Sequence, residues 1–347
     1  MKDERGRITL PLQMKRRNTR RSNWSGLRVL LHFSAFILGC ALGFAVGAQQ
    51  YPVRPVRVIV NFPPGAGVDI TTRLVTAKLS EALGQQFLVD NRAGAAGNIG
   101  IELASRAAPD GYTLLAATAA AAVSQTVFPK IPFDLVRDFA PVSMMASAPF
   151  VLAVHPSVQA KTLAELLALA KAKPGQLSYA TPGTGSSPHL AGELLKMLSG
   201  TSMLHVPYKG MVPAATDVMG GNVPILFGNS LVVLPAARSG KLRAIAITTL
   251  RRSGVAPELP TIAESGFPGY ESGTWYGLMA PVRAPREIVT RLNGAVVKAV
   301  QLADVREKLI AQGAEPIIMT PEEMGAFVRA EIAKWGKVAK AANIRLE

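Results

Sequence analysis

Short apolar runs alternate with amphipathic segments along the chain from Gln49 onward. The runs have the length and β-branched content of strands, and the segments between them repeat apolar positions at helical spacing. Strands are expected at Val56–Phe62, Phe87–Asn91, Tyr112–Ala117, Val151–Val154, Leu177–Ala180, Met203–Pro207, Val223–Phe227, Leu242–Ile247, Tyr276–Ala280 and Glu315–Ile318. Helices are expected at Asp69–Leu83, Ile99–Ala107, Leu163–Lys173, His189–Leu198, Ala214–Gly220, Val232–Ser239, Arg286–Leu302, Val305–Gln312 and Pro321–Ala341.

This alternation is typical of α/β proteins whose mostly parallel sheets carry helices on both faces. Ten strands are many for one doubly wound sheet, so we expect two α/β lobes with a cleft between them. In open α/β sheets ligands bind beyond the carboxyl ends of the strands, which makes the loops after strands the candidate site. Two helix starts carry capping boxes, Thr162 to Glu165 and Thr320 to Glu323.

The most informative motif is a strand, a glycine turn and a helix start within Val56–Asp69. The first turn of a helix has free backbone N–H groups and a partial positive charge, so this turn favours an anion. No Gly-Lys-Ser/Thr follows, and the spacing differs from the dinucleotide fingerprint, so a phosphate chain is not expected here. An ordinary strand-to-helix connection is the alternative interpretation.

Further strand ends lead into turns that carry small residues, at 92–98, 118–120, 181–189, 208–210 and 228–230, and all of these except 118–120 contain glycine. Glycine lets the backbone approach a ligand closely, and Ser and Thr hydroxyls add hydrogen-bond donors. Turn chemistry alone explains any single loop. The recurrence of such loops at successive strand ends favours a small anion held by backbone N–H groups and hydroxyls.

Catalytic and metal sites are not expected. Ser186, Ser187 and His189 lie close in sequence, but no Gly-x-Ser-x-Gly elbow is present, so His189 is expected to cap or pack the start of its helix. His155 and His205 lack partners at metal-ligand spacing.

Three other residues keep two interpretations each. Asp69 is either a general base or a cap of its helix, and its place in the first turn favours the cap. Lys209 pairs with a ligand carboxylate or is a solvated loop lysine. Trp275 and its neighbour Tyr276 wall the cleft or pack in the core.

The formal net charge of +15 is unevenly distributed over the 347 residues. Residues 1–48 carry nine Lys or Arg and two acidic residues, so nearly half of the excess lies in this segment. The chain shows no Lys/Arg stripe with interleaved aromatic residues, so nucleic-acid binding is not expected. The remaining positive charge suits the steering of small anions.

The uncharged run Val29–Ala48 follows the basic cluster Lys15–Arg21 and ends in small residues. It predicts a secretory signal over residues 1–48, cleaved after Ala48, and a periplasmic location. Two alternatives are an uncleaved membrane anchor and a lipoprotein box that would lipidate Cys40, the sole cysteine. Translation from Met14 would shorten the leader.

A series of motifs then identifies a family, at Phe62–Asp69, Asp90–Gly100, Ala108–Leu114, Asp138–Val142, Ser186–Glu193, His205–Gly210 and Gly240–Ala244. In this order they resemble the periplasmic substrate-binding proteins of tripartite tricarboxylate transporters, the Bug (Bordetella uptake gene) or TctC-like family. The resemblance runs from Tyr51 to about Lys340.

The resemblance implies a two-lobed fold of the type II periplasmic-binding-protein kind, each lobe a mostly parallel sheet flanked by helices. Lobe 1 would comprise residues 51–150 and 275–347, and lobe 2 residues 151–274. It also implies a receptor rather than an enzyme, with no cofactor, that works as a monomer and delivers a small carboxylate to integral-membrane permease subunits. The implied ligand contacts are Phe62, Gly65, Ala66, Gly67, Asp69, Thr118, Thr184, Gly185, Ser186, Ser187, Tyr208, Lys209, Asn229 and Trp275.

The chain departs from the family pattern at Ala66, Val68, Gly228 and Pro224, where glycine, threonine and two aspartates are usual. The loss of two acidic groups near the cleft leads to the hypothesis of an aromatic or otherwise less polar monocarboxylate. Two alternative functions are a ligand-loaded partner of a membrane sensor kinase and a periplasmic hydrolase of carboxylic esters.

Overall fold

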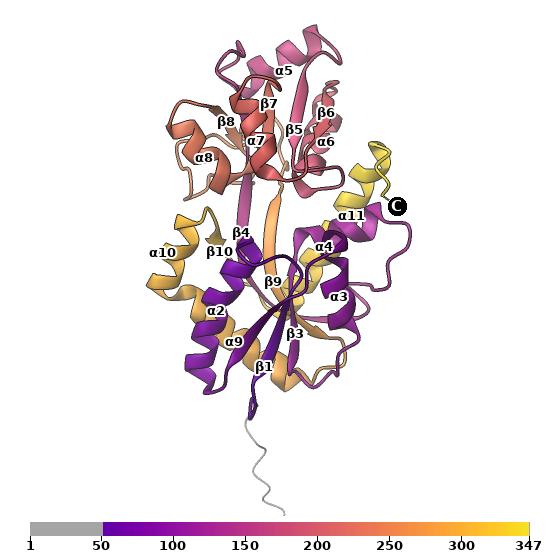
Figure 1. The fold of residues 1–347 in the computed structure, drawn as a ribbon, viewed down its shortest axis with the longest axis vertical. Helices are drawn as coiled ribbons and strands as arrows, with labels where there is room; N and C mark the ends of the chain where they lie inside the picture. The colour runs from indigo at the N-terminus through magenta and orange to yellow at the C-terminus, as the bar shows by residue number, and fades with distance from the viewer. Residues whose placement is uncertain (1–50, 347) are drawn as a thin grey trace, which may run out of the picture. The chain divides into compact units, whose positions relative to one another are not determined.

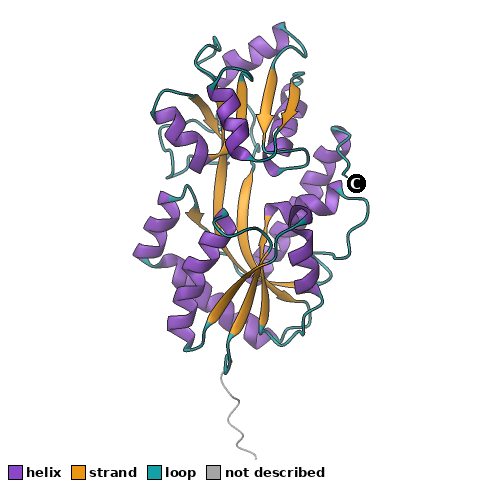
Figure 2. Ribbon diagram, in the orientation of Figure 1, coloured by secondary structure: helices purple, strands orange, loops and turns teal. Residues whose placement is uncertain are grey.

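Two groups of parallel strands meet through a shared antiparallel pair in residues 51–346, the part of the chain that the computed structural model describes (Figure 1). The strands are β1 (Val56–Val60), β2 (Phe87–Asn91), β3 (Thr113–Thr118), β4 (Phe139–Val154), β5 (Ser178–Thr181), β6 (Leu204–Pro207), β7 (Ile225–Asn229), β8 (Arg243–Ile247), β9 (Gly273–Pro281) and β10 (Glu315–Pro316). Helices flank the strands of each group (Figure 2).

The helices are α2 (Gly67–Leu83), α3 (Asn98–Ser105), α4 (Ala119–Val127), α5 (Leu163–Ala172), α6 (Ser187–Ser199), α7 (Met211–Met219), α8 (Ser230–Arg238), α9 (Arg286–Gln301), α10 (Ala303–Ala311) and α11 (Pro321–Ala341), with the short 3₁₀ turn η1 (Ala95–Gly97). Each strand and helix that the sequence pattern predicts is present in the described residues. The pattern does not predict α4, because the small residues at 118–120, where this helix begins, are interpreted as a turn. It also predicts only the end of β4, whose first part is broken by two prolines and two irregularities of register.

The strand order is β2-β1-β3-β9-β4-β7-β5-β6, with β8 and β10 also paired to β4. The outer strands pair in parallel, β1 with β2 and β3, and β5 with β6 and β7. The pairs that involve β4 or β9 are antiparallel. Residues Phe139–Pro149 of β4 pair with β9, and Phe150–Val154 pair with β7 and β8, so β4 belongs to both groups.

Helix α11 links two hydrophobic cores. Its first half buries Met324 and Val328 beside residues of β3 and β9, and its second half buries Trp335 and Val338 beside residues of α5 and α6. Buried Glu331 accepts hydrogen bonds from the indole Nε1 atoms of Trp335, at 3.0 Å, and of Trp275 on β9, at 3.2 Å. The carboxylate thereby ties α11 to the central strand pair.

No helix within residues 51–346 is both long enough and apolar enough to cross a membrane. The expected signal sequence, its cleavage after Ala48, the lipidation of Cys40 and the start at Met14 lie outside the described residues.

The two predicted capping boxes differ in the structure. At α11 the Thr320 hydroxyl accepts the Glu323 N–H and the Glu323 carboxylate accepts the Thr320 N–H, so the box is complete. At α5 the Thr162 hydroxyl accepts the Glu165 N–H, but the Glu165 carboxylate bonds the N–H of Lys161 instead.

We expect Thr320→Ala to lower the free energy of unfolding by about 1 kcal/mol, because the Glu323 N–H in the first turn of α11 loses the hydroxyl that accepts it. Urea unfolding followed by circular dichroism measures this change. Thr290→Ala, which removes an exposed hydroxyl from the middle of α9, is the matched control and should change stability by less than about 0.5 kcal/mol. Equal effects of the two substitutions would contradict the capping assignment.

Candidate functional site

A cavity of about 330 Å³ lies where strands from the two groups end. It is lined by residues at the carboxyl ends of β1, β3, β5 and β7, the position at which open α/β sheets bind ligands. Its volume is in the range of small-molecule sites. The lining residues are Phe62, Ala66, Gly67, Val68, Ala96, Thr118, Ala120, Ser124, Val127, Phe128, Phe150, Pro182, Gly183, Thr184, Gly185, Ser186, Ser187, Pro188, Asn229, Thr274, Tyr276 and Leu346.

Four helices begin at this cavity. Gly67 opens α2, Thr118 precedes α4, Ser187 opens α6 and Asn229 precedes α8, and all of these residues belong to the lining. At α2, α4 and α8 no side chain caps the first turn. Free N–H groups and the positive ends of the helix dipoles therefore converge on one space, which favours an anion there.

The lining contains no Lys, Arg, His, Asp or Glu. Attraction for an anion must therefore come from backbone dipoles and hydroxyl groups. The Thr118 hydroxyl is buried and has no hydrogen-bond partner in the described residues. A buried unpaired polar atom requires an explanation, and a ligand oxygen in the cavity would supply the missing partner.

Much of the remaining lining is apolar, with Phe62, Phe128 and Phe150 from three different segments. Leu346, which follows α11, completes this part of the wall. Its N–H donates to the carbonyl of Val127 at 2.8 Å, and its side chain packs so closely over Gly185 that a Cβ atom there would lie 2.5 Å from Leu346 Cδ1.

The structure brings most of the expected contact residues to the cavity: Phe62, Ala66, Gly67, Thr118, Thr184, Gly185, Ser186, Ser187 and Asn229. Gly65, Asp69, Tyr208, Lys209 and Trp275 do not line it. Tyr208 donates its hydroxyl to Asp217 at 2.5 Å, and Lys209 is exposed. Trp275 is only 2% exposed and binds Glu331, whereas its neighbour Tyr276 faces the cavity.

Asp69 holds the first turn from behind the cavity. Its carboxylate accepts hydrogen bonds from the Gly65 N–H at 2.9 Å, from Arg73 Nε at 3.0 Å and from Asn91 Nδ2 at 2.9 Å. Burial alone would raise the pKa of Asp69, but these bonds outweigh it and hold the pKa below its ordinary value. This arrangement agrees with the interpretation of Asp69 as a cap.

The sequence pattern missed several lining residues. Ser124, Val127 and Phe128 belong to α4 or follow it, and this helix was not expected. Leu346 carries no local signal, because only the fold brings the end of α11 to the cavity. Thr274 lies on β9, where the alternation of strand side chains is the available guide. Tyr276, two residues further along β9, lines the cavity, in line with the first of its two interpretations.

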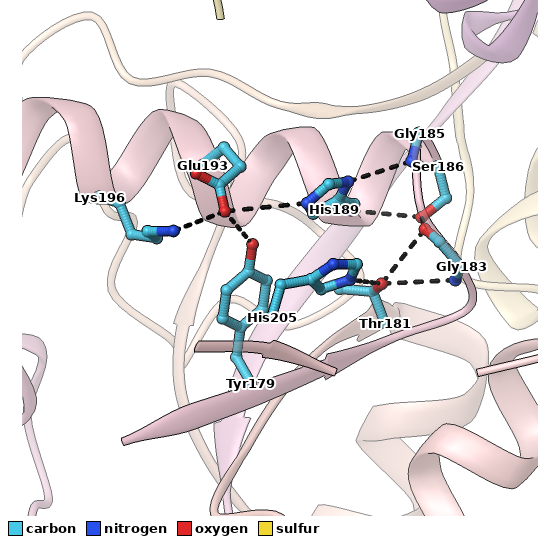
Figure 3. Close-up of polar contacts among 9 residues, drawn as sticks. All are labelled: Tyr179, Thr181, Gly183, Gly185, Ser186, His189, Glu193, Lys196 and His205. Atoms are coloured by element: carbon cyan, nitrogen blue, oxygen red, sulfur yellow. Dashed lines mark hydrogen bonds and ion pairs between the residues drawn. The ribbon is translucent and has the colours of Figure 1, made fainter. Parts of the chain in front are cut away.

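A buried polar network supports the loop that precedes α6 (Figure 3). His189 Nδ1 accepts the Gly185 N–H at 3.1 Å, and His205 Nε2 lies 2.6 Å from the Thr181 hydroxyl. The two imidazole rings stack with their centroids 3.6 Å apart. Burial lowers the pKa of His189 to about 3 and that of His205 to about 4, so both rings are neutral near pH 7.

Glu193 lies at the other side of this network. Its carboxylate accepts hydrogen bonds from the Tyr179 hydroxyl at 2.5 Å and from Lys196 Nζ at 2.7 Å. The carboxylate is 3.8 Å from His189 Nε2. Within residues 51–346 no group of three or more His, Cys, Asp or Glu is placed to hold a metal ion.

Comparison with known proteins identifies the relatives of this chain. The profile of the tripartite tricarboxylate transporter family receptors, TctC, matches residues 71–344. Protein BugT of Bordetella pertussis is 38% identical over 322 residues, covering 92% of this chain and 99% of that protein.

Two solved structures are also similar. One, described as a periplasmic transporter, is 41% identical with a TM-score of 0.73, covering 86% of this chain and 100% of that chain. An R. palustris protein solved with adipate is 37% identical with a TM-score of 0.74, covering 85% of this chain and 99% of that chain. The expected two-lobed α/β fold of periplasmic binding proteins is confirmed by these structures.

The neutral histidines predict a pH-dependent stability. Between about pH 6.5 and pH 4 the unfolded chain binds protons that the folded chain does not, so the free energy of unfolding falls as the pH falls. We expect the urea concentration at the unfolding midpoint to be lower at about pH 5 than at about pH 7.5. This difference between the two pH values should be smaller in His189→Asn than in the wild type.

The control is His155→Asn, which removes a histidine outside this network. The urea midpoint of this variant should change with pH as that of the wild type does. Parallel pH profiles for the wild type and His189→Asn would show that His189 makes no such contribution.

Proposed function

Because the chain belongs to the tripartite tricarboxylate transporter receptor family, we propose that it is an extracytoplasmic solute receptor that holds a small carboxylate in the cavity described above. One observation carries the assignment: four helix N-termini converge on a cavity without charged side chains. Such a site attracts an anion and offers it hydrogen-bond donors on several sides. A relative solved with adipate supports a carboxylate as the ligand.

The cavity also favours a particular class of carboxylate. Phe62, Phe128, Phe150, Val127 and Leu346 present carbon atoms to the ligand. A second or third carboxylate placed against them would lose water without gaining partners. We therefore propose a monocarboxylate with an aromatic or otherwise apolar body, its carboxylate bound near the starts of α2, α4 and α6.

Capture would proceed by closure of two lobes, residues 51–150 with 275–347 and residues 151–274. With these bounds, β4 and β9 would connect the lobes, and the cavity would take its lining from segments of both. A ligand that bridges the lobes binds the closed form more tightly than the open form, and this difference in affinity shifts the population toward closure.

We propose that the loaded receptor, a monomer in the periplasm, delivers its ligand to integral-membrane permease subunits. Export would use the signal sequence in residues 1–48. The second candidate function is that the ligand-loaded receptor docks on a membrane sensor kinase. A pull-down from membrane fractions, with and without ligand, would distinguish the two partners.

The hydrolase alternative finds less support in the geometry. The Ser186 hydroxyl donates to the carbonyl of Gly183 at 2.6 Å and accepts the His189 N–H. His189 Nδ1 is occupied by the Gly185 N–H. A serine nucleophile needs an imidazole acceptor at its hydroxyl, and His189 does not hold that position for Ser186.

A thermal-shift panel tests the ligand class. We expect benzoate and phenylacetate to raise the melting temperature of the exported chain more than adipate, malate or citrate do, since at equal concentration the ligand with the lower Kd stabilises the folded state more. Tight binding of citrate without a response to the aromatic acids would contradict the proposed ligand. Turnover of carboxylic esters by the purified protein would instead support the hydrolase.

The unpaired hydroxyl of Thr118 gives a second test. We expect Thr118→Val to lower the affinity for the carboxylate about tenfold, the effect of one hydrogen bond to a charged group. The melting temperature of the free protein should stay the same or rise, because a buried hydroxyl without a partner is removed. Isothermal titration calorimetry and thermal unfolding measure the two quantities.

Thr72→Val is the matched control. Thr72 lies in α2, and its hydroxyl is also buried without a partner in the described residues, but it does not line the cavity. It should leave the affinity unchanged. If both variants bind the carboxylate as the wild type does, Thr118 is not a ligand contact.

A further inference from the structure

The loop Gly183–Ser187 carries hydroxyls and N–H groups to the cavity, yet its own sequence gives it little rigidity. Gly183 and Gly185 adopt φ values of 151° and 72°, which glycine reaches readily. Inside the loop the Ser186 hydroxyl donates to the Gly183 carbonyl at 2.6 Å. Two further contacts to the loop come from the residues beneath it.

His189 supplies the first of these contacts. Its Nδ1 accepts the Gly185 N–H at 3.1 Å, so the hydrogen of the neutral ring is on Nε2. The bond directs the Gly185 N–H toward the His189 ring, as Figure 3 shows. A proton on Nδ1 would place two N–H groups against each other and break the contact.

His205 supplies the second contact through Thr181 at the end of β5. The buried Thr181 hydroxyl lies 2.6 Å from His205 Nε2. The same hydroxyl lies 3.3 Å from the carbonyl oxygen of Gly183 and accepts the Gly183 N–H at 3.4 Å. The two histidines thus hold two successive points of the loop.

The surroundings keep this pair fixed and uncharged. The rings stack at 3.6 Å with an interplanar angle of 14°, so two imidazolium charges would face each other at contact distance. Tyr179 of β5 packs 5.1 Å from the His205 ring. The nearby charges are Glu193 and Lys196 of α6, which bind each other at 2.7 Å. Neutral rings keep their acceptor atoms available.

We propose that the stacked pair of His189 and His205 positions the Gly183–Ser187 loop for ligand binding, His189 by accepting the Gly185 N–H and His205 by fixing the Thr181 hydroxyl. This inference rests on the proposed function for its effect on affinity, but not for its effect on the loop. The histidines are positioning residues, since neither lines the cavity.

The binding test compares two substitutions of one residue. His189→Asn keeps an acceptor oxygen close to the place of Nδ1, and His189→Leu removes the acceptor but retains the bulk. With benzoate and adipate as probes, calorimetry should show an affinity loss of about tenfold for His189→Leu and of less than about threefold for His189→Asn. His155→Leu, outside the network, should bind as the wild type does.

A second measurement reports on the loop without any ligand. In ¹⁵N-labelled protein the Gly185 N–H···Nδ1 bond should give a scalar coupling between the Gly185 and His189 nitrogens, and the Gly185 amide should exchange slowly. Exchange should be at least about tenfold faster in His189→Leu, at temperatures where all variants remain folded.

Equal losses of affinity in His189→Leu and His189→Asn would assign the effect to packing and overturn the inference. Unchanged Gly185 exchange in His189→Leu would overturn it as well. A wild type that binds neither benzoate nor adipate, but shows the coupling and slow exchange, would leave the loop assignment supported and would count against the proposed ligand instead.

Discussion

The antiparallel pairing of β4 with β9 is the contact on which the rest of the structure depends. One stretch of β4, Phe139–Pro149, pairs with β9, and the next, Phe150–Val154, pairs with β7 and β8. Strand β9 in turn pairs with β3, so the two groups of strands are joined through the β4–β9 pair. As a result, parallel strands from the two groups end at one cavity, and the helices that follow them begin there. No single motif specifies this convergence.

The convergence explains how an anion can be favoured without a cationic side chain. Each helix start contributes a partial positive charge of roughly half an elementary charge, together with free N–H groups. The buried carboxylate of Asp69 does not cancel this positive charge. Behind the turn, Arg73 forms an ion pair with the carboxylate and Asn91 donates a hydrogen bond to it. The apolar wall contributed by Phe62, Phe150 and Leu346 keeps the local dielectric low, which strengthens the interaction with these dipoles.

Periodicity in the sequence was sufficient to predict the order of strands and helices, and glycine turns at strand ends were sufficient to predict the loops of the site. Periodicity was not sufficient where the local residues are untypical of the helix or strand that they form. The alanines of α4 read as a turn, and the prolines in the first part of β4 read as a loop, although its pairing with β9 makes it a strand. On β9 the neighbours Trp275 and Tyr276 point to opposite faces, so only Tyr276 reaches the cavity. The contribution of Leu346 depends on the path of α11, which no local pattern encodes.

The uncharged lining has a consequence for how receptors of this architecture diversify. The preference for an anion resides in the backbone at the helix starts, which a change of side chain leaves intact. In the proposed site, the choice among anions would reside in small lining side chains such as Thr118, Thr184 and Ser187 and in apolar ones such as Phe128. On this proposal, a single substitution in the lining would change which anion binds but would leave the preference for anions intact, so new specificities would be reachable through functional intermediates.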